Sequence, residues 1–175
     1  MMFGLRKKVK ESKDAIYLMN VLEQSNKVAH DFMTFGLSEE ELQMYDTEKC
    51  QEIQFEYEIA MLGIFSYMVA SLNGYEVAVK MVEIYRINVE KCVEENLPNN
   101  IMPEDAVEKA NQYYQKARFI SEELMSQEKG LDTILHTLAE NIFYWIGTGI
   151  KESDVGFVQF ILEDLYKEAF EQLRK

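Results

Sequence analysis

"EYEIAMLGIFSYMVASLNG" (residues 56–74) is the segment around which the rest of this chain must fold. Between positions 59 and 72, apolar side chains occupy nearly every face of a helix instead of forming one stripe along it. A helix that is apolar all round has to be enclosed on all sides. At 1.5 Å per residue the segment spans about 21 Å, which is short of the roughly 30 Å hydrocarbon core of a bilayer. We therefore predict the central helix of a bundle, and no transmembrane segment.

Apolar residues at three-and-four spacing indicate further helices on both sides of this segment. The two prolines lie in one connector, and we find no convincing strand. The sequence therefore predicts an all-α fold with more than roughly 65% helix, a single-domain bundle of about six helices over residues 1–175, two of them strongly apolar and centrally buried. The expected helices cover about 9–35, 38–73, 75–95, 103–130, 134–146 and 153–175. The expected inward stripe of the first helix is Ala15, Leu18, Met19, Leu22, Ala29 and Phe32.

The segment "GLSEEEL" carries a helix start signal. Gly36 is suited to the left-handed position that ends a helix. Ser38 then has Glu41 three residues later, which is a capping box, and Leu37 and Leu42 are spaced as a hydrophobic staple. A second start is expected at position 47.

The second strongly apolar segment is "NIFYWIGTGI" (residues 141–150), which contains the single tryptophan. We expect Phe143 and Tyr144 to lie off the inward face of this helix, so that they need cover from this chain, a partner or a ligand. Two glycines end the helix, and without a preceding strand and a following lysine they do not form a phosphate loop. The expected inward face is Ile134, Leu135, Leu138, Ala139, Ile142, Trp145 and Ile146.

The net charge of −13 disfavours nucleic acid as a partner, because phosphate binding needs clustered Lys and Arg. Residues 1–13 hold five basic side chains against one acidic side chain, a net charge of +4, which leaves −17 on the rest of the chain. An acidic body favours basic partners. In the basic segment we expect Phe3 and Leu5 to pack on the domain while the lysines face its acidic surface, so that the segment does not bind membranes.

The cysteines indicate a reducing compartment. Cys50 and Cys92 form no C-x-x-C motif, which is typical of free thiols in a cytoplasmic protein. The apolar run after the basic segment is short, is interrupted by a polar residue and lacks a cleavage site, so we expect no secretory signal.

Catalytic motifs are scarce. Neither His30 nor His136 has a glutamate three residues before it, and no H-E-x-x-H occurs. We interpret His136 and Glu140 as an ordinary helix pair. Glu168 and Glu171 have no matching acidic cluster for magnesium chemistry. The sequence therefore predicts no catalytic, metal-binding or cofactor-binding residues, and a protein that is not an enzyme.

Two functions fit the acidic charge, the two strongly apolar segments and the scarcity of catalytic motifs. The leading hypothesis is an acidic protein-interaction module of the inhibitor, immunity, adaptor or chaperone type for a basic or amphipathic protein partner, or a homodimer that shares an apolar surface. The alternative is a small-molecule-binding helical domain with an apolar pocket lined by aromatic and Met side chains. An exposed acidic and aromatic patch would favour the first, and a pocket of several hundred Å³ the second. The candidate interaction or pocket residues are Phe65, Tyr67, Tyr113, Tyr114, Phe143, Tyr144 and Trp145.

Overall fold

The computed structural model describes residues 2–33, 36–45, 47–95 and 102–173, and the side chains within these ranges except those of 2–12, 89–95 and 173. The structure is 89% helical and its described residues contain no strand, which confirms the all-α prediction. The helices, in chain order, are α1 (Met2–Phe32), α2 (Glu39–Met44), α3 (Thr47–Asn73), α4 (Tyr75–Glu95), α5 (Pro103–Ser126), α6 (Leu131–Ile146) and α7 (Glu152–Leu173).

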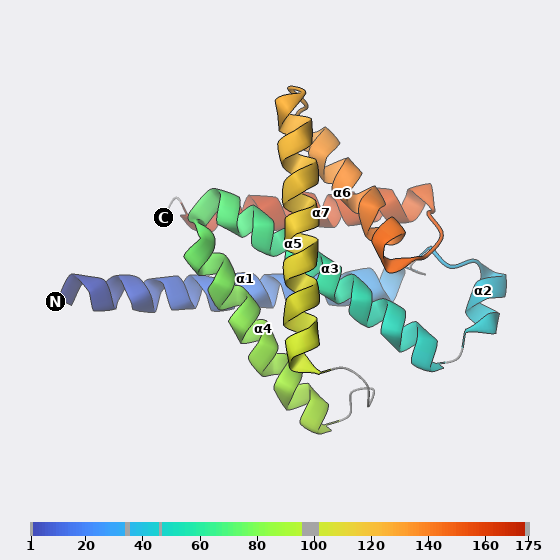
Figure 1. Ribbon diagram of the computed structural model, residues 1–175, viewed down its shortest axis with the longest axis horizontal. Helices are drawn as coiled ribbons and strands as arrows, with labels where there is room; N and C mark the ends of the chain where they lie inside the picture. The colour runs from blue at the N-terminus through green and yellow to red at the C-terminus, as the bar shows by residue number, and fades with distance from the viewer. Residues whose placement is uncertain (1, 34–35, 46, 96–101, 174–175) are drawn as a thin grey trace.

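Helix α3 is the centre of the bundle, as the sequence predicts. Every side chain from position 59 to 66 is buried, and α3 contacts α1, α4, α5, α6 and α7. In Figure 1, α5 crosses in front of α3, while α1 and α7 pass behind it. By length and composition α3 is the one described helix that could cross a membrane, but 67% of its most apolar window is buried inside the protein. The other helices of the chain provide that cover.

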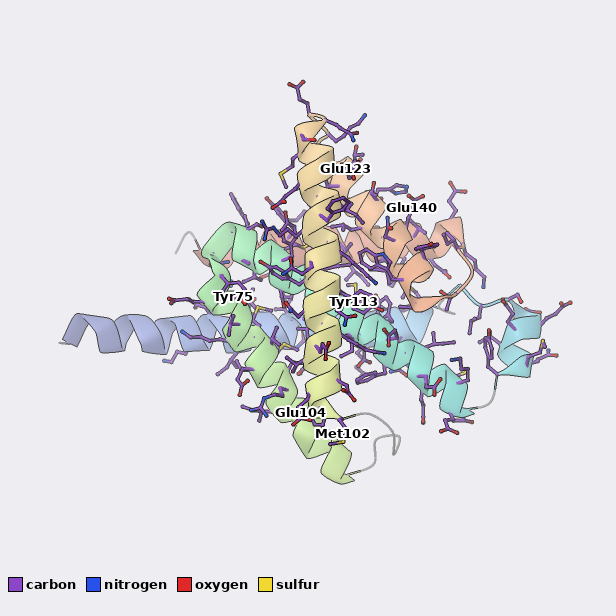
Figure 2. The ribbon with its side chains drawn as sticks, viewed as in Figure 1. Tyr75, Met102, Glu104, Tyr113, Glu123 and Glu140 are labelled. Atoms are coloured by element: carbon purple, nitrogen blue, oxygen red, sulfur yellow. The ribbon has the colours of Figure 1, made fainter. Side chains whose placement is uncertain are left out.

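Helices α3 and α5 approach each other most closely at Gly63. A Cβ atom added there would lie 2.6 Å from both the Ala110 carbonyl oxygen and the Tyr113 Cβ atom. The buried face of α5 is also built from small side chains, because Ala106, Ala110 and Ala117 are at most 1% exposed. Helix α5 therefore lies almost backbone to backbone on α3. It begins at Pro103, as predicted, and Figure 2 shows Glu104 near its start and Glu123 near its other end.

Two predicted signals after α1, the left-handed glycine and the capping box, are confirmed. Gly36 is left-handed, with φ of 72°. The Ser38 hydroxyl accepts a hydrogen bond from the Glu41 backbone N–H at 3.1 Å, and the Glu41 carboxylate accepts one from the Ser38 N–H at 2.8 Å. The second start expected at position 47 is also present, because Tyr45 is extended (ψ 128°) and a new helix begins at Thr47. The chain therefore has seven described helices instead of about six.

The inward stripe of α1 is wrong at its last position. Phe32 is 76% exposed and its ring lies against Phe157, with 6.0 Å between the ring centres. The next inward residue after Ala29 is Met33, which is 6% exposed. A helical turn has 3.6 residues, so Met33, four residues after Ala29, lies closer to the line of Ala29 than Phe32 does. The buried Asn26, which also belongs to the inward face, continues the same line between Leu22 and Ala29. Residues 34–35, the end of the expected helix, lie outside the described residues.

Phe143 is fully buried, so of the covers that the sequence left open the one from this chain is present. Its cover comes from the loop after α1, where a Cβ added to Gly36 would lie 3.5 Å from the Phe143 ring. The same Cβ would lie 1.6 Å from the Gly149 carbonyl oxygen, so the two glycines meet backbone to backbone. Asp154 accepts a hydrogen bond from the Gly36 N–H at 3.2 Å, and Lys151 donates one to the Leu37 carbonyl. Gly147, with φ of 73°, ends α6 as predicted.

The basic N-terminal segment forms the first turns of α1. Its backbone extends beyond the other helices at the left of Figure 1. The expected packing of Phe3 and Leu5 concerns side chains outside the described part of the chain, and so does the placement of Cys92. These two points stay predictions.

Candidate functional site

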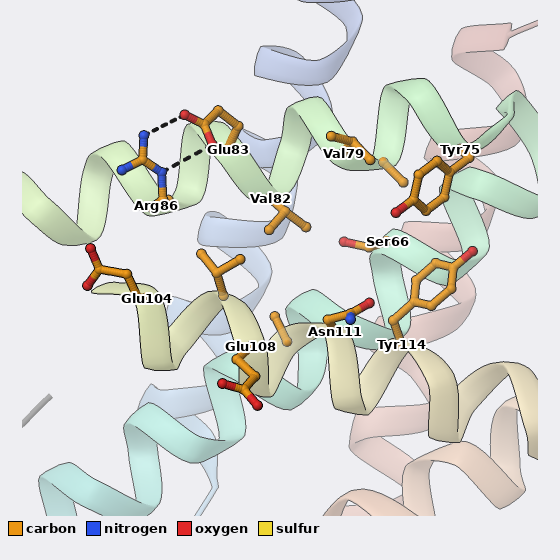
Figure 3. A pocket seen from close by; sticks show the side chains of 13 residues that line it. Ser66, Tyr75, Val79, Val82, Glu83, Arg86, Glu104, Glu108, Asn111 and Tyr114 are labelled. Carbon is orange, nitrogen blue, oxygen red and sulfur yellow. Dashed lines mark hydrogen bonds and ion pairs between the residues drawn. The ribbon is translucent and has the colours of Figure 1, made fainter. Parts of the chain in front are cut away.

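A groove of about 430 Å³ lies between α4 and α5, with its floor on α3 (Figure 3). We call it the α4–α5 groove. Its walls are mainly valine, alanine and tyrosine, and its rim carries charged side chains. Three other hollows, of about 390, 350 and 230 Å³, lie elsewhere around α3. The α4–α5 groove combines apolar walls with four charged rim residues, Glu83, Arg86, Glu104 and Glu108.

The groove exists because α5 packs more closely on α3 than on α4. Helix α4 leaves α3 through Gly74, whose φ of 92° allows the tight reversal. Helices α4 and α5 then run antiparallel and diverge away from the connector that joins them (Figure 1). The facing side chains between them are small, such as Ala78, Val79 and Val107. These side chains are too short to fill the space that the divergence leaves.

The floor of the groove contains a polar group without a partner. Ser66 is 1% exposed, and its hydroxyl oxygen forms no hydrogen bond with any described residue. Figure 3 shows this hydroxyl directed into the groove, between Val82 and Tyr114. A buried polar group without a hydrogen bond costs about 1–3 kcal/mol. Ser66 is therefore placed to exchange a hydrogen bond with a molecule that enters the groove.

One end of the groove is acidic. Arg86 forms two hydrogen bonds with the Glu83 carboxylate, at 2.6 and 3.1 Å, and they lower the pKa of Glu83. Glu104 and Glu108 lie one helical turn apart on α5, and neither forms an ion pair with a described residue. The four charged lining residues together carry a net charge of −2.

Tyrosine rings form the opposite end of the groove. Tyr75 and Tyr114 both line it and meet edge to face, with 6.4 Å between ring centres. Tyr114 also meets Tyr67 edge to face at 5.8 Å. Burial raises the pKa of Tyr67. The structure thus brings two of the predicted residues, Tyr67 and Tyr114, together with Tyr75, which the sequence reasoning did not single out.

Tyr113 and Trp145 form a separate cluster that joins three helices. Their rings lie 5.6 Å apart, and the Lys116 ammonium group lies over both, 4.7 Å from the centre of the Tyr113 ring. The Tyr113 hydroxyl donates a hydrogen bond to Glu56 at 2.5 Å, and Lys109 pairs with the same carboxylate. Burial, followed by this hydrogen bond, raises the pKa of Tyr113. These contacts tie α5 to α3 and α6, so the cluster holds the bundle together.

The remaining predicted residues lie apart from the groove. Phe65 and Phe143 are fully buried, whereas Tyr144 is 75% exposed. Of the seven predicted residues only Tyr114 lines the groove. Sequence reasoning missed Ser66 and the valines of α4 and α5 because small side chains on a helix stripe look the same whether or not a facing helix covers them.

The described histidines take part in local polar contacts. His136 lies 2.8 Å from Gln159 through Nδ1 and 3.5 Å from the Glu140 carboxylate through Nε2, which is the helix pair that the sequence indicates. His30 lies 3.7 Å from the Asp31 carboxylate. Cys50 is a half-buried free thiol. Within the described ranges no three His, Cys, Asp or Glu residues are grouped as metal ligands would be.

Comparison with family models, with curated proteins and with solved structures finds no match to this chain.

Proposed function

We propose that this protein binds an amphipathic small molecule in the α4–α5 groove. The volume of about 430 Å³ lies within the range of roughly 300–1,000 Å³ that is common for small-molecule pockets. Such pockets are mostly apolar with a few placed polar groups, and the groove has this composition. The observation that carries the proposal is the buried Ser66 hydroxyl, which faces the groove and has no partner among the described residues.

The lining differs in kind from the pocket that we expected from sequence. Valine and alanine form the walls, with two tyrosines at one end, in place of a lining of Tyr, Phe, Met and Trp. Aliphatic walls fit an alkyl chain or a small ring system and contribute through the apolar area that the ligand removes from water. We therefore choose 1-octanol, an uncharged molecule with an apolar body and one hydroxyl, as the first probe.

Calorimetric titration with 1-octanol tests this function. In the Val82→Trp variant a large side chain occupies the middle of the groove, and we expect the affinity for octanol to fall at least about tenfold. Val28→Trp is the matched control, because Val28 is 45% exposed on α1 and does not line the groove. Circular dichroism checks that both variants keep their helices. No binding by the unmodified protein, or equal binding by the two variants, would refute the proposal.

A protein-interaction module for a basic or amphipathic partner is the second candidate function. The acidic net charge and strongly exposed aromatic residues such as Phe119 and Tyr144 support it. Much of the apolar surface that suggested a shared interface is enclosed within this chain, because α3 is central and Phe143 is covered by the loop at Gly36. Light scattering tests this candidate: an apolar homodimer should persist in about 0.5 M salt, whereas a complex steered by charge should weaken.

A further inference from the structure

The α4–α5 groove has two chemically different ends. Because α4 and α5 are antiparallel, Arg86 lies near Glu104 and Tyr75 lies opposite Tyr114 (Figure 3). Charged side chains therefore gather at the end near the start of α5, and tyrosines gather at the other end. The apolar walls and the Ser66 hydroxyl lie between them. A ligand that fits all three parts is itself polar at one end and apolar along its body.

The charged end favours a cation. The Arg86 guanidinium is engaged by Glu83, so this pair adds no net charge. Glu104 and Glu108 lack an ion-pair partner among the described residues, and like charges four residues apart on a helix repel each other. A cation bound near either carboxylate would reduce this repulsion. The acidic surface of the whole protein also raises the local concentration of cations.

The Ser66 hydroxyl indicates a ligand independently of the charged residues, because it is buried and has no hydrogen-bond partner among the described residues. Ser66 is 1% exposed, so few solvent molecules compete for its hydrogen bond, and Asn111 is the other uncharged polar side chain of the lining besides the tyrosines. A hydroxyl both donates and accepts, and it can therefore bond an N–H group or an oxygen on the body of a ligand.

We infer, on the basis of the proposed function, that the ligand of the groove is an organic amine with an apolar body. Its ammonium group lies at Glu104 and Glu108, and its body passes Ser66 toward Tyr75 and Tyr114. Either an aliphatic or an aromatic ligand body fits the tyrosine end of the groove, because the Tyr75 and Tyr114 rings meet edge to face and so offer both edges and faces.

A matched series of probes tests the charge preference. Octylamine, 1-octanol and octanoate share an alkyl chain and differ in charge at neutral pH. We expect the affinity to decrease in that order, with octylamine at least about tenfold tighter than octanoate and weakened by added salt. Equal affinities for octylamine and octanol, both lost in Val82→Trp, would overturn the amine inference and leave the proposed function intact. Failure of all three probes to bind would overturn both.

The double variant Glu104→Gln/Glu108→Gln locates the charged end. It should reduce octylamine affinity about fivefold to tenfold and leave octanol affinity unchanged. The control is Glu48→Gln/Glu123→Gln, which removes two exposed carboxylates that do not line the groove. Equal effects of the two double variants would show general attraction by the acidic protein and would overturn the assignment of the ammonium position.

Ser66→Ala separates a binding role from a structural one. If the hydroxyl serves the ligand, removing it should lower the affinity for hydrogen-bonding probes about threefold or more. The thermal midpoint of the free protein should stay the same or rise, because an unpaired buried hydroxyl is lost. A fall in the thermal midpoint with unchanged octanol and octylamine affinity would show that Ser66 only supports the fold.

Discussion

The two faces of α5 show how the same kind of small side chain can close one helix contact and leave another open. On one face, α5 packs against α3 so closely that Gly63 has no room for a Cβ atom. On the other face, α4 diverges from α5 and a groove of about 430 Å³ remains. Ala110 belongs to both, since its carbonyl meets Gly63 and the residue lines the groove. Helix α5 comes close to α3 because Gly63 has no side chain there, and a groove remains toward α4 because that helix diverges.

We expect the largest change in the free energy of unfolding from a substitution where α5 packs on α3. Gly63→Val should destabilise the protein by about 3 kcal/mol, because the added atoms meet backbone atoms of α5 that cannot move independently. Gly156→Ala is the control within another helix: a Cβ there meets nothing within 4 Å, so stability should rise by about 0.5–1 kcal/mol. Urea denaturation measures both. If Gly63→Val is as stable as the unmodified protein, the close approach of α3 and α5 does not exist.

Substitutions at two neighbouring residues of α5 allow a direct comparison of its face toward α3 with its face toward α4. Ala106 is fully buried on the closed side, and Val107 lines the groove. Ala106→Leu should cost about 2 kcal/mol through overpacking. Val107→Leu should change the free energy of unfolding by less than about 0.5 kcal/mol, because the extra methylene enters open space. Similar losses from both substitutions would contradict the difference between the two faces.

A smaller effect is expected far from both faces, at the cap of α2. Ser38→Ala removes the hydroxyl that accepts the Glu41 N–H and should cost about 1 kcal/mol. Octylamine should stabilise the native protein by binding to it, and the loss caused by Ser38→Ala should be the same with and without this ligand, because distant sites are additive. A loss that changes when octylamine is added would indicate that the groove is coupled to α2.

The residues themselves show which parts of this structure the sequence could predict. The enclosure of α3 and the cap at Ser38 depend on local pattern, so both were predictable. The placement of Phe32 was wrong and the source of cover for Phe143 was left open, because their surroundings come from segments distant in sequence. The groove was not predicted, for the same reason. Its floor at Ser66 becomes a site only because α5 lies close on α3 at Gly63 while α4 diverges from α5.

Nuclear magnetic resonance of valine methyl groups during an octylamine titration tests the central claim most directly. The claim is that the face between α4 and α5 is open to ligands while the core around α3 is closed. We predict that the methyl signals of Val79, Val82 and Val107 shift on titration, and that those of Val69 and Val158, which are fully buried elsewhere, do not. Absence of any shift, or equal shifts at Val69 and Val158, would contradict the account.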